Sequence, residues 1–149
     1  LNKRRRHNLM YADNGQEPDY ENKKGRIISW DDVPILKKAV DKLKEFGGTK
    51  AENLVCEGNK YKKFEKKTNV GIGWHGDSER KKVFAIKCGH SMDLRYRWYH
   101  QRTIISRKVN IKLNHGDAYI MSEWAVGQKW KSSSLVTIRH CAVPCGEVE

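Results

Sequence analysis

Apolar residues recur at helical spacing in one segment near the start of the chain. They are Ile35, Leu36, Ala39, Val40, Leu43 and Phe46. Charged residues occupy most of the positions between them, so the pattern predicts an amphipathic helix over residues 33–46. Asp31 or Asp32 can cap its start, and Pro34 suits its first turn. Gly47-Gly48 is expected to end it.

From residue 83 onward the pattern changes to short strands separated by turn residues. Apolar and polar residues alternate through much of this region, as they do in strands with one buried face. The expected strands are 83–88, 94–99, 109–114, 118–121 and 135–139. One early helix followed by many strands predicts a mainly β fold with a flanking helix, either a β-sandwich or a jelly roll.

Composition and charge narrow the class of protein. The chain has 149 residues, long enough for one domain with a hydrophobic core, so residues 1–149 are expected to form a single domain. Its longest apolar run is 83–86, too short to span a membrane. Lysine and arginine outnumber aspartate and glutamate by 30 to 18, a net charge of +12. This charge favours a polyanionic partner, nucleic acid first and an anionic membrane surface second.

The cysteines are sparse and irregularly spaced, so they predict no disulfide framework. Free thiols in an intracellular protein of the cytoplasm or nucleus are the expected state.

The clearest chemical motif is the segment Gly71-Ile72-Gly73-Trp74-His75-Gly76-Asp77, just before an expected strand. His75 and Asp77 are two residues apart, so on an extended segment their side chains point to the same side. Imidazole and carboxylate are suitable ligands for Fe(II), and two histidines with one carboxylate leave positions open for a co-substrate and O2. A second pair, His115 and Asp117, lies in an apparent hairpin turn and is interpreted as structural.

Several segments resemble, in the same order, the AlkB-type Fe(II)/2-oxoglutarate-dependent dioxygenases. That family has an Asn-x-Tyr motif, an Ile-Gly-x-His-x-Asp motif followed by acidic residues and Arg, a Leu-x-His-Gly-Asp turn and a closing Asn-Leu-Thr-Phe-Arg strand. The matching segments here are 59–61, 71–80, 113–117 and 135–139. Residues 4–8 and 11–13 resemble its basic nucleotide-handling hairpin, and the 33–46 helix falls where the family has one.

The resemblance implies a double-stranded β-helix, or jelly roll, with its catalytic core at 59–140 and a basic nucleotide-handling segment at 1–29. It implies Fe(II) and 2-oxoglutarate as cofactors. His75 and Asp77 would bind the iron. Asn59 and Tyr61 would contact 2-oxoglutarate, and Arg139 would hold its distal carboxylate, a task suited to a guanidinium.

The third iron ligand is open. The family's second histidine aligns near Trp130-Lys131, and neither residue is a usual iron ligand. His140 is the best replacement, but it is adjacent to Arg139, and neighbours on a regular strand face opposite sides. Both can serve one site only if a bulge or a strand end redirects one of them. The alternatives are a two-ligand site completed by water and a degenerate site.

The expected activity is oxidation of a base in DNA or RNA, for repair or modification, with O2 and 2-oxoglutarate converted to CO2 and succinate. Expected nucleic-acid contacts are Arg4, Arg5, Arg6, His7, Asn8 and Tyr11. Four aromatic residues are candidates for base stacking, although two of them, Tyr96 and Trp98, share a face with Leu94 and fit the core better. The other two are Trp74 and Tyr99. Two alternatives are a catalytically inactive nucleic-acid-binding domain on the same fold and a hydroxylase of protein side chains.

Overall fold

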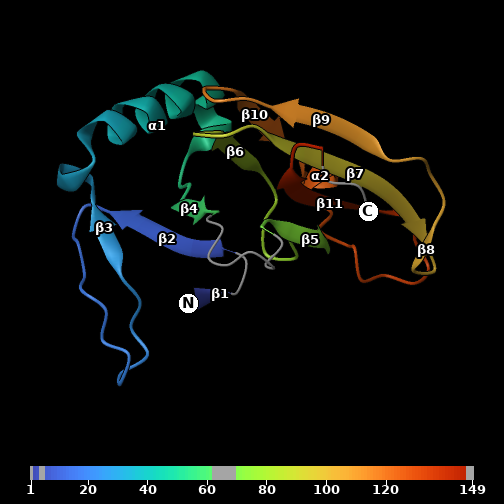
Figure 1. The fold of residues 1–149 in the computed structure, drawn as a ribbon, viewed down its shortest axis with the longest axis horizontal. Coiled ribbons are helices and arrows are strands. Elements are labelled where there is room, and N and C mark those ends of the chain that lie inside the picture. The colour runs from blue at the N-terminus through green and yellow to red at the C-terminus, as the bar shows by residue number, and fades with distance from the viewer. Residues whose placement is uncertain (1, 4–5, 62–69, 147–149) are drawn as a thin grey trace. The chain divides into compact units, whose positions relative to one another are not determined.

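A computed structural model describes residues 2–3, 6–61 and 70–146 of the chain (Figure 1). The chain divides into two compact units, Leu1–Asn69 and Val70–Glu149. The expected 1–29 segment and the start of the expected 59–140 core lie in the first unit, and most of the expected strands lie in the second.

The first unit contains a small sheet built around β2 (Arg6–Ala12). Strands β1 (Asn2–Lys3) and β4 (Cys56–Lys60) pair antiparallel with β2, and β3 (Ile27–Ser29) pairs parallel with it. The rings of Tyr11 and Trp30 stack with their centroids 5.3 Å apart. Tyr11 is therefore packed within this unit.

The predicted helix is confirmed as α1 (Pro34–Gly47). Its predicted cap is wrong, because Asp31 and Asp32 belong to a separate 3-10 turn, η1 (Trp30–Asp32), which is capped by Ser29. Val33 is the N-cap residue of α1 and makes no side-chain capping bond. A second 3-10 turn, η2 (Gly48–Ala51), follows the helix.

The second unit contains a curled antiparallel sheet and a two-stranded sheet (Figure 1). The larger sheet has the order β5 (Ile72–His75), β11 (Thr137–Pro144), β7 (Met92–His100), and β7 also pairs with β8 (Thr103–Ile104) and β9 (Val109–Leu113). The smaller sheet pairs β6 (Val83–Ile86) with β10 (Ala118–Met121). A short helix, α2 (Glu123–Val126), follows β10.

One face of the large sheet packs on the small sheet and on α2. The buried side chains are Leu94, Tyr96, Leu113, Met121 and Val126. We call this the inner face of the large sheet. The alternation along residues 94–98 correctly predicts that Leu94 and Tyr96 are buried, whereas Trp98 is 38% exposed near the end of β7.

The mainly β class with a helix is confirmed. The last strand begins two residues later than expected and continues to Pro144, so it carries His140 within it. None of the four cysteines forms a disulfide, as predicted. Within the described ranges, no helix has the length and apolar character needed to span a bilayer.

Candidate metal centre

The His75-Gly76-Asp77 segment leaves the end of β5 and is held from behind by the turn after α2. The Asp77 amide donates a hydrogen bond to the Val126 carbonyl, 2.8 Å away. A side chain at Gly76 would overlap the Gly127 carbonyl oxygen and the Trp130 ring, so only glycine fits between the two polar residues. The Trp130 indole donates to the Ser78 hydroxyl at 3.1 Å. The segment is therefore fixed on both sides of Asp77.

His140 lies directly opposite His75, because β11 and β5 pair in a register that aligns these two residues. The ring centroids are 4.4 Å apart. Asp77 reaches both rings, with its two oxygens each 3.7 Å from one Nε2 atom. One ligand atom from each of the three residues lies within 4.8 Å of the others. The expectation that His140 joins His75 and Asp77 is confirmed as geometry.

The surroundings prepare the two imidazoles to bind a cation. His75 Nδ1 is 2.7 Å from the Gly73 carbonyl oxygen, to which it donates as N–H, and this leaves Nε2 as the lone-pair donor that faces Asp77. Burial, followed by the nearby charge of His75, lowers the pKa of His140 to about 4. His140 is therefore neutral at pH 7, the form that ligates metals.

The triad is largely buried, with Asp77 7% and His140 5% exposed. The Arg80 guanidinium lies 3.3 Å from Asp77 Oδ1 and offsets part of the charge of that carboxylate. Two imidazoles and one carboxylate match the donor set of a 2-His-1-carboxylate site, which binds a divalent transition metal and leaves other coordination positions open. The residues present fit such an ion.

Arg139 does not face this triad. The bulge after His140 changes the register with β5 only, while the pairing of β11 with β7 runs without a break from Thr137 to Pro144. Arg139 is therefore opposite Arg97, and its guanidinium carbon is 4.1 Å from the Tyr99 ring centroid. His140 instead contacts Tyr96, on the inner face. The bulge thus fails to bring Arg139 and His140 to one site, against the expected role of Arg139.

The other expected co-substrate residues lie in the first unit. Asn59 is exposed, directly paired with Asn8 across β4 and β2, and accepts a hydrogen bond from the Asn8 amide at 3.5 Å. Tyr61 is half-buried just after β4. Their expected contact with 2-oxoglutarate stays a prediction.

The expected nucleic-acid residues are also in the first unit. Arg6 and His7 are in β2, beside Asn8, and Tyr11 stacks on Trp30. Arg4 and Arg5 lie outside the described residues. Their proposed contacts with nucleic acid stay predictions.

The second His-x-Asp pair has the predicted structural role. Asp117 accepts a hydrogen bond from the Asn114 amide at 2.7 Å and closes the turn between β9 and β10. His115 Nδ1 accepts from the Gly89 amide at 3.0 Å. Gly116 has a φ of +88°, which favours glycine at this position.

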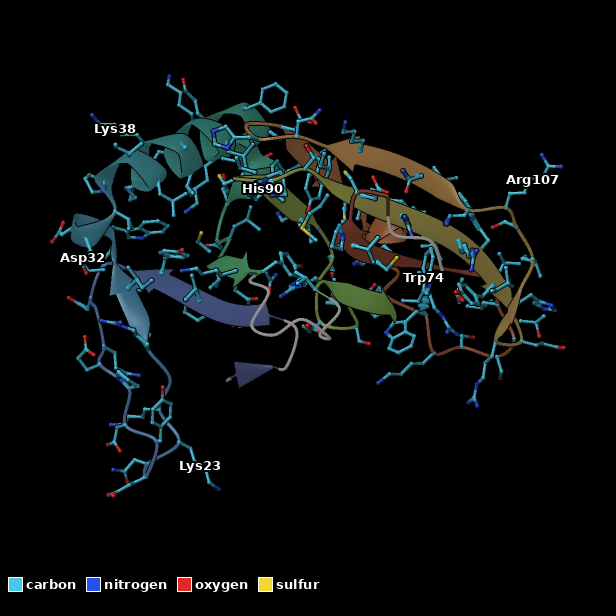
Figure 2. All side chains as sticks on the ribbon, in the orientation of Figure 1. Lys23, Asp32, Lys38, Trp74, His90 and Arg107 are labelled. Carbon is cyan, nitrogen blue, oxygen red and sulfur yellow. The ribbon has the colours of Figure 1, made fainter. Side chains whose placement is uncertain are left out.

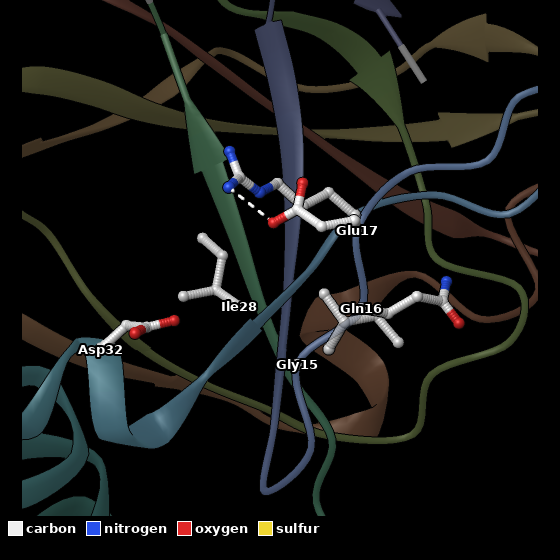
Figure 3. A pocket seen from close by; sticks show the side chains of 7 residues that line it. Gly15, Gln16, Glu17, Ile28 and Asp32 are labelled. Atoms are coloured by element: carbon white, nitrogen blue, oxygen red, sulfur yellow. Dashed lines mark hydrogen bonds and ion pairs between the residues drawn. The ribbon is translucent and has the colours of Figure 1, made fainter.

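A hollow of about 610 Å³ lies elsewhere, in the first unit (Figure 3). It is lined by residues 15–17 and 26–28 and by Asp32. An exposed ion pair joins Arg26 and Glu17 at 3.1 Å. None of the expected catalytic residues lines this hollow.

The contacts that hold the triad in place escaped the sequence analysis, although Trp130 and Arg80 both lie in segments that it named. Gly127 and Trp130 are far from the motif along the chain, and their contact with Gly76 depends on how α2 packs. Arg80 stands three residues after Asp77, and that spacing between opposite charges was a usable signal.

Comparisons with known proteins supply a relative but no family. No family model matches the chain, and no solved structure matches it. The chain is 41% identical over 140 residues to an uncharacterized protein of Acanthamoeba polyphaga mimivirus. The match covers 94% of this chain and 53% of that protein, so the chain spans about half the length of this curated relative. The function is therefore argued from the triad.

Proposed function

We propose that this protein is an Fe(II)/2-oxoglutarate-dependent dioxygenase of the AlkB-like type that oxidises a base in DNA or RNA. The observation that carries the proposal is the convergence of His75, Asp77 and His140, two imidazoles and a carboxylate brought together from β5 and β11. This donor set is the one expected of a non-haem iron oxygenase.

The second unit supports a jelly-roll assignment. A jelly roll has eight strands in two sheets. Strands β5, β11, β7 and β9 form one antiparallel layer, and β6 and β10 form part of a second layer across the core. The triad lies at one end of the inner face, where β5 and β11 pair.

The triad and the residues around it have distinct tasks in this proposal. Fe(II) with 2-oxoglutarate would supply the chemistry, in which decarboxylation of the acid drives oxygen insertion into a C–H bond. His75, Asp77 and His140 would hold the metal. The Gly73 carbonyl orients His75, and the contact of Gly76 with Trp130 orients Asp77. The burial of His140 and Asp77 limits the access of water to that side of the site.

Nucleic acid is the proposed substrate because of the charge of the chain. A net charge of +12 attracts a polyanion over long range. A base within a duplex would have to be flipped out or presented in a single strand to reach a largely buried site. The same positive charge favours a polyanion over a protein side chain as the substrate.

The second candidate is a nucleic-acid-binding domain without oxygenase activity. The position of Arg139 favours it, because the guanidinium expected to hold 2-oxoglutarate projects from the other face of β11. Both candidates keep the triad, but they differ in whether 2-oxoglutarate binds beside it.

An anaerobic titration separates the two candidates. Fe(II) and 2-oxoglutarate are added without oxygen, and the visible charge-transfer band of their chelate is recorded for the wild type and for His75→Ala. The dioxygenase requires a band in the wild type that His75→Ala loses. Metal binding without such a band would contradict the dioxygenase and favour the binding domain. Conversion of 2-oxoglutarate to succinate with methylated oligonucleotides then tests the substrate.

A further inference from the structure

Arginine and aromatic side chains alternate on the outer face of the large sheet, the face turned away from the triad. Trp74, labelled in Figure 2, lies on this side of β5, because neighbours on a strand face opposite sides and the adjacent His75 faces the triad. The Arg97 guanidinium carbon is 5.1 Å from the Trp74 ring centroid. The Arg139 guanidinium carbon is 4.1 Å from the Tyr99 centroid and 5.3 Å from the Trp130 centroid. Aromatic rings therefore hold both guanidinium groups in fixed positions.

The two arginines are placed at an energetic cost. Arg97 and Arg139 are direct partners in the antiparallel pairing of β7 and β11, and like charges in that position destabilise a sheet. Farther along the same face, Arg95 is neutralised by Asp93 through a 3.0 Å ion pair. Arg139 has no such carboxylate, since it forms no ion pair with any described residue. The charge of Arg139 is thus not offset by any carboxylate of the described residues.

Arg139 also has unused hydrogen-bonding capacity. Its Nε atom is buried and lacks a hydrogen-bond partner within the described chain. A buried donor without a partner destabilises a folded protein. The residue as a whole is only half-buried, so part of its side chain is open to a ligand. Lys131, exposed beside Trp130 with its Nζ 5.4 Å from that ring centroid, adds a third positive charge.

We propose that Arg139, Arg97 and Lys131 form a phosphate-binding site on the outer face of the β5–β11–β7 sheet, and that its ligand is the backbone of a single-stranded nucleic acid. A guanidinium held flat on a ring presents its N–H edge as a fork that matches two phosphate oxygens. Basic side chains interleaved with aromatic rings are the arrangement by which proteins bind single strands without sequence preference.

The site is separate from the metal centre but joined to it through one side chain. Trp130 contacts Arg139 on the outer face and also lies against Gly76. Gly76 is the residue between the two metal ligands His75 and Asp77. A strand bound at Arg139 would therefore lie one side chain from the triad. The inference takes its ligand class from the proposed nucleic-acid substrate and requires none of the iron chemistry.

The test measures binding of a fluorescein-labelled single-stranded oligonucleotide by anisotropy at several salt concentrations, with a chelator present. The variant is Arg139→Gln. The control is Arg107→Gln, which removes the same charge from the exposed segment between β8 and β9, away from Trp74 in Figure 2. We expect Arg139→Gln to weaken binding several-fold and to reduce the slope of log affinity against log salt by about 0.7, the value for one lost phosphate contact on a single strand. Arg107→Gln should leave the slope unchanged.

Two further measurements keep the result decisive. Co(II) binding at the triad reports whether each variant is folded, and Arg139→Lys replaces Arg139→Gln if the latter is not. Arg139→Lys keeps the charge but loses the planar fork, so it too should weaken binding. Equal slopes for the Arg139 and Arg107 variants would overturn the site. So would binding to phosphatidylserine vesicles that depends on Arg139 while the oligonucleotide does not bind. Because the chelator removes metal, loss of dioxygenase activity and loss of this site are distinguishable.

Discussion

His75 and His140 are direct partners across the antiparallel pair of β5 and β11, and their ring centroids are 4.4 Å apart. The two rings come from opposite ends of the second unit's sequence and meet only because the sheet aligns them. Asp77, two residues after His75, completes the group. The pairing of β5 with β11 thus assembles the candidate metal centre.

Removal of either imidazole should abolish tight metal binding. We expect His75→Ala and His140→Ala to weaken Co(II) binding by about 100-fold or more, since even loss of an outer-shell partner of a metal ligand costs about 10–100-fold. Absorption spectroscopy of the Co(II) complex measures the affinity. His100→Ala, at the exposed end of β7, is the control and should bind normally. Normal binding by His140→Ala would exclude His140 from the site.

Arg80 should oppose metal binding by its charge. Its guanidinium lies 3.3 Å from an Asp77 oxygen, so it would repel a divalent cation and compete for the carboxylate. We expect Arg80→Gln to raise Co(II) affinity by about 2- to 5-fold, the scale of a partly exposed ion pair. Lys81→Gln removes the same charge at the next, exposed residue and should change the affinity less. A lower affinity in Arg80→Gln would mean that Arg80 mainly orients Asp77.

Gly76 should tolerate no side chain, whereas Gly73 on the same segment should. A Cβ at Gly76 would overlap Gly127 and Trp130, but a Cβ at Gly73 meets nothing within 4 Å. We expect Gly76→Ala to lower the free energy of unfolding by about 1–3 kcal/mol, the usual cost of overpacking. Gly73→Ala should stay within about 0.5 kcal/mol of the wild type. Urea denaturation compares the two variants, and equal stabilities would contradict the close packing behind Asp77.

The buried pair of Asp93 and Arg95 should make stability depend on pH. Burial acts to raise the pKa of Asp93, but hydrogen bonds from Arg95, Cys145 and Asn110 outweigh it and hold that pKa below its ordinary value of 3.8. A lowered carboxyl pKa stabilises the fold above the ordinary value, and this contribution is lost as pH falls through the folded-state value. We therefore expect Asp93→Asn to be about 3–5 kcal/mol less stable at pH 7, because it leaves a buried arginine uncompensated.

The pH dependence supplies the check on Asp93. The difference in unfolding free energy between the wild type and Asp93→Asn should shrink as pH falls below about 4, where the wild-type carboxyl also becomes neutral. The control Glu79→Gln removes an exposed carboxylate from the same unit and should show little difference at any pH. A difference for Asp93→Asn that stays constant from pH 7 to pH 2 would contradict the charge-based explanation.

Local patterns predicted the elements well where neighbouring residues determine them. The helical spacing of residues 33–46 gave α1 within a residue at each end, because an amphipathic face and two terminal glycines act within the segment itself. The alternation of Leu94 and Tyr96 identified one face of β7. The cap of α1 was predicted wrongly, because Asp31 and Asp32 belong to a separate 3-10 turn that Ser29 caps.

By itself, the sequence determined the charge, the helix α1, most of the strands after residue 83 and the His-x-Asp segment, because composition and local patterns suffice for these. Only the tertiary structure decided which residues share a site with that segment. Pairing of β11 with both β5 and β7 brought His140 to the inner face and turned Arg139 to the outer one. Neighbours on a strand point to opposite faces, and the register of distant strands, which no local pattern encodes, selects the residue that meets the metal ligands.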